Sequence, residues 1–418
     1  ECREALEHLA RRSGITLSRS VQEKDRGGGR NALKSALLDA SKLWQYLLSH
    51  PLHGAEAREY LLRRGMTESD MLFWGVGFAP KAWDVLLKAL LKRGHSVDVL
   101  FQAGLIVKKD GGAGRYFDRF RDRIMFPIRS VQGDVVGFTG RLLHESEEAG
   151  GKYVNTPETA LYNKSQVIFG LHAARQFVRE AGYAVLLEGQ MDVIASHRAG
   201  VKQAVAVSGT AFTVEQAKLL RRYTEEVRMA FDGDSAGVQA ALRSVDVLYA
   251  AGIRVRAICI PDGAGKDPDE CVKKDKDIWV SAVDGAEDMM EWLMGIAEKM
   301  HDIKTAHGKR KAAEMVLLRI AVIVSDIEKD HYLRMLSDRL QVGVDVLRSE
   351  LRKMSSDNSN KIEKKDIADT VKAVEVSSPA DSHLARFLVL LFTVPGLRAP
   401  FDGLPLLHTV PGLYASLA

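Results

Sequence analysis

Cysteine is scarce in this sequence, and its spacing excludes two common uses. The three cysteines, Cys2, Cys259 and Cys271, lie far apart, and no two of them are separated by only two residues. This spacing excludes a zinc ribbon and a disulfide framework, so the chain is expected to bind no zinc. The lack of disulfide patterns is typical of a reducing compartment, and a cytoplasmic location is therefore expected.

Long apolar runs and a secretion signal are also missing. The longest apolar stretches, 315–324 and 387–394, fall short of the roughly 18 to 20 residues that cross a bilayer. The beginning of the chain has no basic region followed by an apolar region. No membrane partner is expected. The net charge of +4 permits a nucleic-acid partner without arguing for one.

The length of 418 residues predicts two to four domains. The sequence starts without methionine, inside an apparent helix, and stops soon after a new apolar segment begins, so we interpret it as a fragment truncated at both ends. Residues 1–30 are expected to form a helix and then a flexible linker, because three glycines follow one another at 27–29. Residues 31–105 have helical apolar spacing.

The middle of the chain has the clearest architecture. Residues 115–143 form strand-like runs with a turn sequence at 132–134. The segment 183–262 then alternates four short apolar runs with three helical patterns. This β-α-β-α-β-α-β order with short connections predicts a parallel sheet covered by helices on both faces. Residues 287–354 are helical in pattern, and the polar, aromatic-free residues 355–380 are interpreted as a linker.

Carboxylates follow three of the four predicted strands. Glu188 ends the first strand, and Asp192 lies on the first turn of the next helix. Because the carboxyl ends of parallel strands meet at one edge of a sheet, we expect a single cluster there. Like charges in such a cluster need cations, and oxygen ligands without histidine or cysteine favour Mg²⁺ or Mn²⁺ over zinc. The full set is Glu188, Asp192, Asp232, Asp234, Asp267 and Asp269.

Each of these acids also has a structural interpretation. A single Asp or Glu at a strand end is often a helix cap or a turn residue. The segment 232–237 does not form a calcium loop, because Ala236 and Arg243 occupy the fifth and twelfth positions. The occurrence of all six acids in this order is hard to attribute to capping. The sequence therefore predicts a divalent-metal site for phosphoryl-transfer chemistry.

A basic segment precedes the predicted sheet. Residues 115–129 carry five arginines and two aspartates, with aromatic residues between them. Arginine binds phosphate groups bidentately, so the segment is suited to nucleic acid or a nucleoside triphosphate. A solvated surface is an equal alternative on charge pattern alone, because acidic residues nearly balance basic ones over 108–164.

The acidic motifs resemble those of the toprim domain in its bacterial, DnaG-type primase form. They are EGQMDV at 188–193, DGDSAG at 232–237 and GKDPDE at 265–270. Segments on both sides add to the resemblance, among them RFRDRIMFPIRS and KYVNTPET before the sheet and HYLRMLSDRLQVGVDVLRSEL after it. The resemblance extends from Glu1 to about Met354.

The resemblance implies a nucleotidyltransferase, a DNA-templated RNA polymerase that makes short RNA primers without needing a primer itself. Glu188, Asp232 and Asp234 would be the catalytic acids. The six carboxylates together would hold two Mg²⁺ or Mn²⁺ ions, with Asp192 and Asp269 as supporting members. Further residues would bind the template strand and the incoming nucleotide, namely Arg121, Arg123, Arg141, Lys152, Asn155 and Lys164.

The resemblance also implies a domain order and partners. The expected fold is α/β (α+β overall), with a toprim-type parallel sheet covered by helices, a mixed α/β N-terminal subdomain and a helical C-terminal subdomain. The partners would be single-stranded DNA, ribonucleoside triphosphates and the replicative helicase, with a monomeric core acting at bacterial replication forks. The expected parts are a helix and linker after an absent zinc-binding domain (1–30), the N-terminal subdomain (31–175), the toprim domain (176–285), a helical subdomain (286–355), a linker (356–380) and the start of a helicase-binding domain (381–418).

One residue departs from the family pattern, and rival functions remain open. Gln190 stands where the family resemblance predicts tyrosine, which we interpret as a packing variation. A topoisomerase would need a nucleophilic tyrosine on a separate domain. A toprim nuclease usually carries an ATPase phosphate loop, and the sequence has none. A non-catalytic toprim scaffold in DNA repair is a further alternative, and the complete acid set argues against it.

Overall fold

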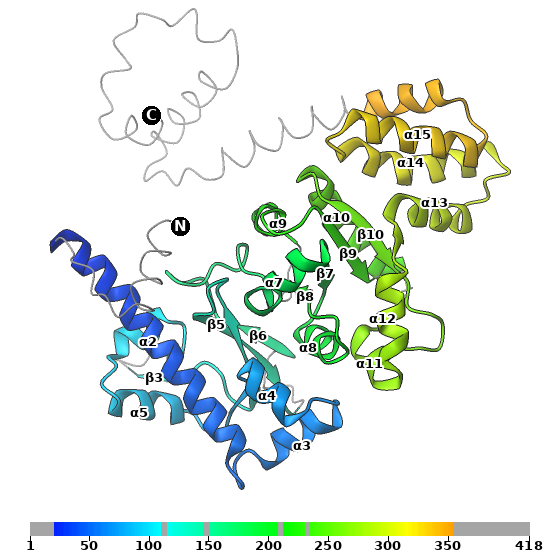
Figure 1. The fold of residues 1–418 in the computed structure, drawn as a ribbon. Helices are drawn as coiled ribbons and strands as arrows, with labels where there is room; N and C mark the ends of the chain where they lie inside the picture. The colour runs from blue at the N-terminus through cyan, green and yellow to red at the C-terminus, as the bar shows by residue number, and fades with distance from the viewer. Residues whose placement is uncertain (1–20, 110–114, 145–150, 208–211, 231–234, 355–418) are drawn as a thin grey trace, which may run out of the picture. The chain divides into compact units, whose positions relative to one another are not determined.

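The computed structural model describes residues 21–354 with short gaps at 110–114, 145–150, 208–211 and 231–234 (Figure 1). The helix expected over residues 1–13, the linker at 355–380 and the module at 381–418 lie outside the described residues. The chain divides into two compact units, Glu1–Asp330 and His331–Ala418. No described helix is both long and apolar enough to cross a membrane.

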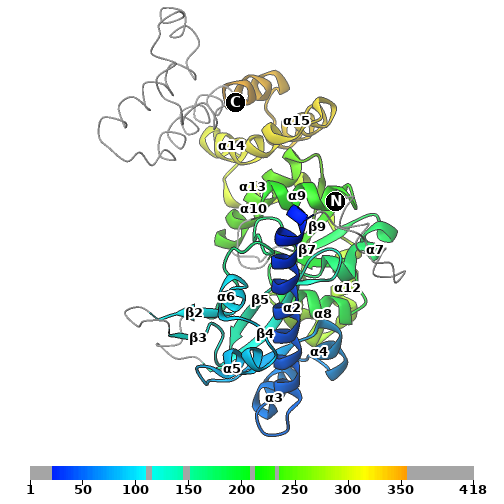
Figure 2. The same ribbon diagram turned by 90° about the vertical axis from the view of Figure 1, so that its left-hand side faces the viewer.

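A long helix, α2 (Val21–Ser49), opens the described chain and runs along strands of the N-terminal sheet (Figure 2). The linker expected at the glycines 27–29 is wrong, because the helix continues through them. Each glycine costs a helix about 1 kcal/mol relative to alanine. The buried side chains of Leu37 and Trp44 offset this cost, and the Trp44 ring packs edge-on against Phe138 with centroids 4.7 Å apart.

Four short helices and a four-stranded antiparallel sheet complete the N-terminal subdomain. The sheet has the order β1-β4-β5-β6. Its central strands are joined by the expected turn, in which Gly133 has φ = +96° and Ser130 N–H donates to the Asp134 carbonyl. The helices are α3 (Ala55–Arg63), α4 (Glu68–Trp74), α5 (Val85–Lys92) and α6 (Val97–Gln102). The strands are β1 (Gly77–Ala79), β4 (Arg123–Arg129), β5 (Val135–Leu142) and β6 (Tyr153–Asn155), with β2 (Ile106–Lys108) and β3 (Tyr116–Asp118) paired separately.

The second sheet confirms the expected parallel architecture and adds one strand. Its order is β11-β10-β9-β7-β8, and β7, β8, β9 and β10 are parallel. The edge strand β11 pairs antiparallel to β10 and was not predicted. The strands are β7 (Ala184–Leu187), β8 (Ala204–Ala206), β9 (Glu226–Ala230), β10 (Arg254–Ile258) and β11 (Glu287–Asp288). The helices around it are α7 (Leu171–Ala181), α8 (Gln190–Arg198), α9 (Val214–Arg221) and α10 (Ser235–Ala250) (Figure 1).

Helices follow the sheet, as the sequence predicts. They are α11 (Pro268–Lys274), α12 (Lys276–Asp284), α13 (Met289–Met300), α14 (Ala306–Val322) and α15 (Asp326–Leu340), and residues 344–354 are also helical. One apolar core joins the N-terminal sheet to the parallel sheet, with Trp74 stacked on Phe169 at a centroid distance of 5.5 Å. This shared core fixes one sheet against the other and positions the pocket between them.

Candidate active site

A pocket of about 490 Å³ lies between the N-terminal sheet and the carboxyl ends of the parallel strands. Its acidic side chains come from the segment after β7 and from the start of α11. Its basic side chains come from the end of α3, from β5, from the residue before β6 and from the residue before Asp267. The acidic lining residues are Glu188, Asp192, Asp267 and Glu270, and the basic ones are Arg64, Arg141, Lys152 and Lys266.

Three of the six predicted carboxylates line this pocket. Glu188 follows the last residue of β7, and Asp192 lies on the first turn of α8. Asp267 is the N-cap of α11, and its carboxylate accepts a hydrogen bond from Glu270 N–H at 2.8 Å. Asp232 and Asp234 belong to the residues after β9 that lie outside the described part of the chain. Their role as ligands stays a prediction.

The Asp192 carboxyl group is in an environment suited to a cation. Burial, and then the charges of Asp267 and Asp269, raise its pKa to about 7. The Asp269 N–H donates to Asp192 Oδ1 at 3.3 Å. A Cβ atom on Gly189 would lie 3.0 Å from Asp192 Oδ2, so the glycine leaves room beside the carboxylate. A divalent cation here would counter the burial and the like charges that raise this pKa, and would favour the ionised carboxylate.

Asp269 lies behind the pocket, and its carboxylate has other partners. Its side chain is 3% exposed and forms ion pairs with Arg64 at 3.0 Å and Lys273 at 2.6 Å. Asp269 does not line the pocket. Because its backbone N–H donates to Asp192, we expect a positioning role for Asp269, and its role as a supporting metal ligand stays a prediction. Within the described residues, no group of three acidic, histidine or cysteine side chains is gathered closely enough to hold a metal.

The basic side of the pocket is ordered by aromatic contacts. Arg141 donates a hydrogen bond to the Tyr153 hydroxyl at 2.6 Å. Its guanidinium also lies 5.6 Å from the Tyr60 ring centroid and 5.4 Å from that of Tyr153. Asn155 accepts a hydrogen bond from the Thr139 hydroxyl at 2.7 Å. The predicted residues Arg141, Lys152 and Asn155 thus share the pocket with the acids.

The other three predicted binding residues do not line this pocket. The guanidinium of Arg121 is stacked on the Trp83 ring, 4.2 Å from its centroid, and on Phe117 at 5.0 Å. Arg123 is 3% exposed and donates to carbonyl groups inside the subdomain, at 3.1 Å for Gly140 and 3.0 Å for Gly151.

The contacts of Arg123 that the structure describes lie inside the protein, and its template-binding role stays a prediction. Arg123 opens a strand whose first six residues are all buried, and its charge is neutralised by carbonyl dipoles instead of phosphate. Lys164 lies in the loop before α7, and its backbone N–H donates to the Glu158 carboxylate at 2.9 Å. The role of Lys164 in binding the template or the nucleotide stays a prediction.

Sequence reasoning did not identify Arg64, Trp83 and Thr139 as functional candidates. Arg64 lies more than 100 residues before the acids along the chain, so only the fold brings it to their edge. Trp83 is 61% exposed, and nothing in the sequence around it indicates that this large aromatic side chain lies at the surface. The only sequence signal was the clustering of aromatic and arginine residues around 115–129.

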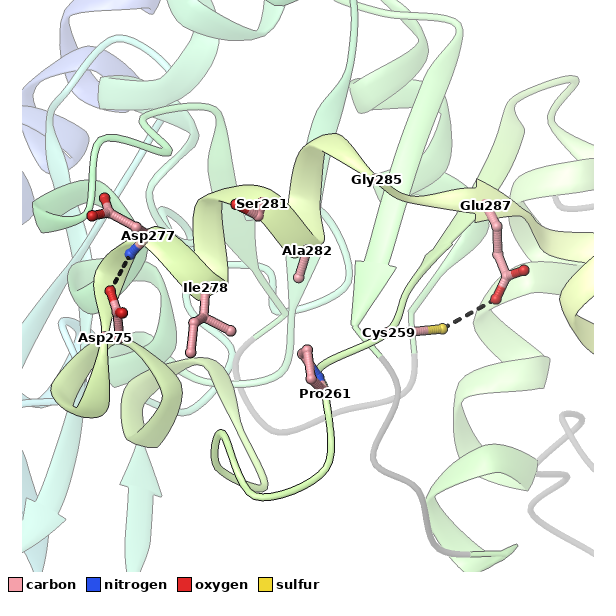
Figure 3. Close-up of a pocket in the computed structure, with 9 residues that line it drawn as sticks. All are labelled: Cys259, Pro261, Asp275, Asp277, Ile278, Ser281, Ala282, Gly285 and Glu287. Atoms are coloured by element: carbon pink, nitrogen blue, oxygen red, sulfur yellow. Dashed lines mark hydrogen bonds between the residues drawn. The ribbon is translucent and has the colours of Figure 1, made fainter.

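A separate pocket of about 550 Å³ lies beside α12 and the chain that leaves β10 (Figure 3). The Cys259 thiol points toward Glu287 and donates to its carboxylate at 3.2 Å. Burial, and then the bond to Glu287 and its charge, raise the pKa of the Cys259 thiol to about 11. The thiol is protonated at neutral pH, so this pocket offers no thiolate nucleophile.

Comparison with protein families matches three consecutive parts of the chain. Residues 44–175 match the N-terminal domain of the DNA primase catalytic core, and residues 185–272 match a toprim-like domain. Residues 290–345 match the DnaB-helicase binding domain of primase. This last match lies before residues 381–418, where the sequence predicts the start of such a domain.

The chain is similar to bacterial DNA primases over most of its length. It is 34% identical to a DNA primase of Halalkalibacterium halodurans, over 83% of this chain and 57% of that protein. It is 33% identical to a DNA primase of Deinococcus radiodurans, over 96% of this chain and 67% of that protein. The chain thus spans less than two thirds of the Halalkalibacterium relative.

Solved structures of primase cores superpose on the chain. A DNA primase domain from Pseudomonas aeruginosa is 33% identical, with a TM-score of 0.67 over 77% of this chain and 99% of that domain. A DnaG primase catalytic domain bound to single-stranded DNA is 31% identical, with a TM-score of 0.65 over 76% of this chain and 98% of that domain. Together with the order of matched domains, these similarities show that the chain belongs to the DnaG-type family of bacterial DNA primases.

Proposed function

We propose that the chain carries the catalytic core of a DNA primase, which synthesises short RNA primers on single-stranded DNA. One observation supports this most directly: acids that follow parallel strands line a single pocket of about 490 Å³ together with Arg141 and Lys152. Nucleotidyl transfer needs both acidic and basic side chains. Carboxylates bind the metal ions, and basic side chains bind the triphosphate and the template backbone.

The acidic side is suited to two Mg²⁺ or Mn²⁺ ions, held by Glu188, Asp192 and Asp267 with Asp232 and Asp234. When bound, such ions stabilise the attacking 3′-hydroxyl and the leaving pyrophosphate. Glu188 follows the buried strand β7, so its carboxylate is presented from a rigid element.

The basic side binds and orients the reactants. Arg141 is held by its bond to Tyr153, so its remaining N–H groups are directed without a large loss of side-chain entropy. Lys152 supplies a second positive charge for phosphate groups. The rigid placement of both residues on or beside β5 and β6 keeps the triphosphate aligned with the acids.

The proposed partners follow from the family. Single-stranded DNA is the proposed template, since a related catalytic domain is described in complex with it. The match at 290–345 supports a replicative helicase as the protein partner. Ribonucleoside triphosphates are the proposed substrates. We further propose a monomeric core and action in the bacterial cytoplasm at replication forks.

The test is ribonucleotide incorporation on single-stranded DNA, with Mg²⁺ and Mn²⁺ compared. Glu188→Gln should reduce primer synthesis by a factor on the order of 10³. Glu225→Gln is a matched control, because this carboxylate is 74% exposed and precedes β9 at the opposite edge of the sheet. Relaxation of supercoiled DNA instead of primer synthesis would indicate a topoisomerase. Equal primer synthesis by both variants would overturn the proposal.

A further inference from the structure

A second pocket, of about 640 Å³, lies beside helices α7 and α9 and has a different character. It is bounded by the turn between β4 and β5, the loop 159–168 and the end of α9. It shares no lining residue with the acid-containing pocket. Any ligand bound here would therefore be held by a separate set of side chains.

The lining of this second pocket is positively charged. Among the residues that the structure describes, four arginines line it, namely Arg30, Arg129, Arg175 and Arg222, and no aspartate or glutamate does. Arg129 and Arg175 form no ion pair with any residue between 21 and 354 whose side chain is described. Arginines on protein surfaces are commonly neutralised by neighbouring acids, so the concave placement of Arg129 and Arg175 favours an anionic ligand.

The two central arginines are oriented by the same turn. Arg129 donates from Nη1 to the Gly133 carbonyl at 2.9 Å, and Arg175 donates from Nη1 to the Val131 carbonyl at 2.7 Å. Each guanidinium has five N–H donors. The hydrogen bond to the turn orients the guanidinium, and its other N–H groups can donate to a ligand. Two guanidinium groups held by one turn make a preorganised anion site.

The surroundings of the arginines add no charge but supply hydrogen-bond donors and aromatic rings. Burial, and then the charge of Arg129, lower the pKa of His172 to about 4, with smaller effects of His197 and Arg175. His172 is therefore neutral at pH 7, and the arginines alone carry the charge. Asn163 and Gln166 add amide donors to the lining, and Tyr162 and Tyr223 add aromatic surface. Such a mixture of donors and rings is typical of sites for phosphate attached to an organic group.

We propose that this second pocket binds the phosphate groups of a nucleic-acid backbone or a nucleotide, independently of metal ions. Arginine forks match phosphate oxygens bidentately, and no carboxylate among the described lining residues is placed to attract a metal ion. The inference goes beyond the proposed primer synthesis, because it concerns a site separate from the reacting acids. The pocket would be a second binding site for a molecule that carries phosphate groups.

The test measures binding in EDTA, which removes the metal ions that the acidic pocket would need. The full chain is titrated into a fluorescein-labelled oligothymidylate, and ATP and inorganic tripolyphosphate are added as competitors. The Arg175→Gln/Arg222→Gln variant should bind at least one phosphate probe about tenfold more weakly. For the oligonucleotide, the slope of log K against log salt should fall by about 0.7 for each phosphate group that the variant no longer binds.

Arg254→Gln is the matched control, because Arg254 is 68% exposed and lies on the parallel sheet outside both pockets. Thermal melting verifies that each variant is folded. Arg175→Lys keeps the charge without the bidentate fork, and it should retain the salt slope while losing part of the affinity.

The outcomes separate the two sources of phosphate. Weaker oligonucleotide binding with unchanged competition by ATP would indicate a nucleic-acid backbone. Weaker competition by ATP and tripolyphosphate would indicate a nucleotide. Binding of every probe equal to that of the Arg254→Gln control, in folded protein, would overturn the proposal.

Discussion

The guanidinium of Arg64, at the end of α3, lies 3.0 Å from the buried carboxylate of Asp269 on α11. This ion pair joins the N-terminal subdomain to the segment that carries Asp267. The Asp269 N–H in turn donates to Asp192. Arg64 Nε is buried and has no hydrogen-bond partner among the described residues. The ion pair therefore connects a helix far away in the sequence to the geometry of the acids.

Asp269→Asn should destabilise the protein even without metal. The substitution leaves the charges of Arg64 and Lys273 without their buried partner, which costs about 3 kcal/mol in comparable pairs. Urea unfolding in EDTA measures this loss. Glu270→Gln is the neighbouring control, since its exposed carboxylate is expected to matter little for stability. An unchanged unfolding free energy for Asp269→Asn would contradict the positioning role and favour a role as a metal ligand only.

Trp83→Ala should weaken binding of single-stranded DNA by about tenfold, because stacking of a base on an aromatic ring contributes about 1 to 3 kcal/mol. Trp83 is 61% exposed and has Arg121 stacked on its ring, so it presents a flat surface beside a positive charge. Fluorescence anisotropy with an oligothymidylate measures the affinity. Tyr46→Ala is a fair comparison, because Tyr46 is equally exposed at 61%. Equal losses in both variants would refute a specific stacking role.

Arg121→Gln and Arg123→Gln should separate binding from stability. Arg123→Gln removes donors to buried carbonyl groups and should lower the unfolding free energy by about 2 to 4 kcal/mol. Arg121→Gln should leave the unfolding free energy nearly unchanged and weaken DNA binding. Chemical denaturation and anisotropy on the same preparations make the comparison. The reverse pattern would support the template-binding role predicted for Arg123.

Acidification should destabilise the protein through His197. Burial is the largest cause that lowers its pKa to about 4, and its Nε2–H donates to the Ala204 carbonyl at 2.9 Å. The unfolded chain, with a histidine pKa near 6.5, binds more protons between about pH 6.5 and 4. Stability from this group is therefore present above about pH 6.5 and is lost as the pH falls, by about 3 kcal/mol in total.

The measurement is the unfolding free energy at pH 7.5 and pH 5. His197→Gln should lose less stability on acidification than the wild type does. His53→Gln should behave like the wild type, because His53 is exposed. An equal pH dependence in His197→Gln and wild type would show that this histidine is not the group responsible.

Much of the fold followed from sequence because its signals were local. Short apolar runs that end in acids, alternating with helical patterns, predicted the parallel sheet and the edge at which Glu188 and Asp267 lie. The antiparallel strand β11 has only two residues, Glu287 and Asp288, and carries no apolar pattern to reveal it. The helical spacing from residue 31 predicted most of α2, but its first turns, through the glycines 27–29, were wrongly expected to be a linker because glycine propensity opposed a helix there.

The site was predicted less completely than the fold. The acids could be ranked by their strand-end positions, but the burial of Arg123 could not be predicted. Both faces of β4 are buried, so its sequence shows no alternation of apolar and polar residues that would separate an inward from an outward side chain. Arg64 reaches the pocket, and Trp83 reaches Arg121, through contacts across long sequence separations, which only the folded chain reveals.

Gln190, the residue that departs from the family pattern, is 4% exposed and donates to the Thr139 hydroxyl at 3.2 Å. Thr139 in turn donates to Asn155, so α8 is tied to β5 and β6 through one side-chain relay. A tyrosine at position 190 would need both a new partner and more volume. In an alignment of relatives, the residues at positions 139 and 190 should therefore covary, so that a change at one position is accompanied by a change at the other.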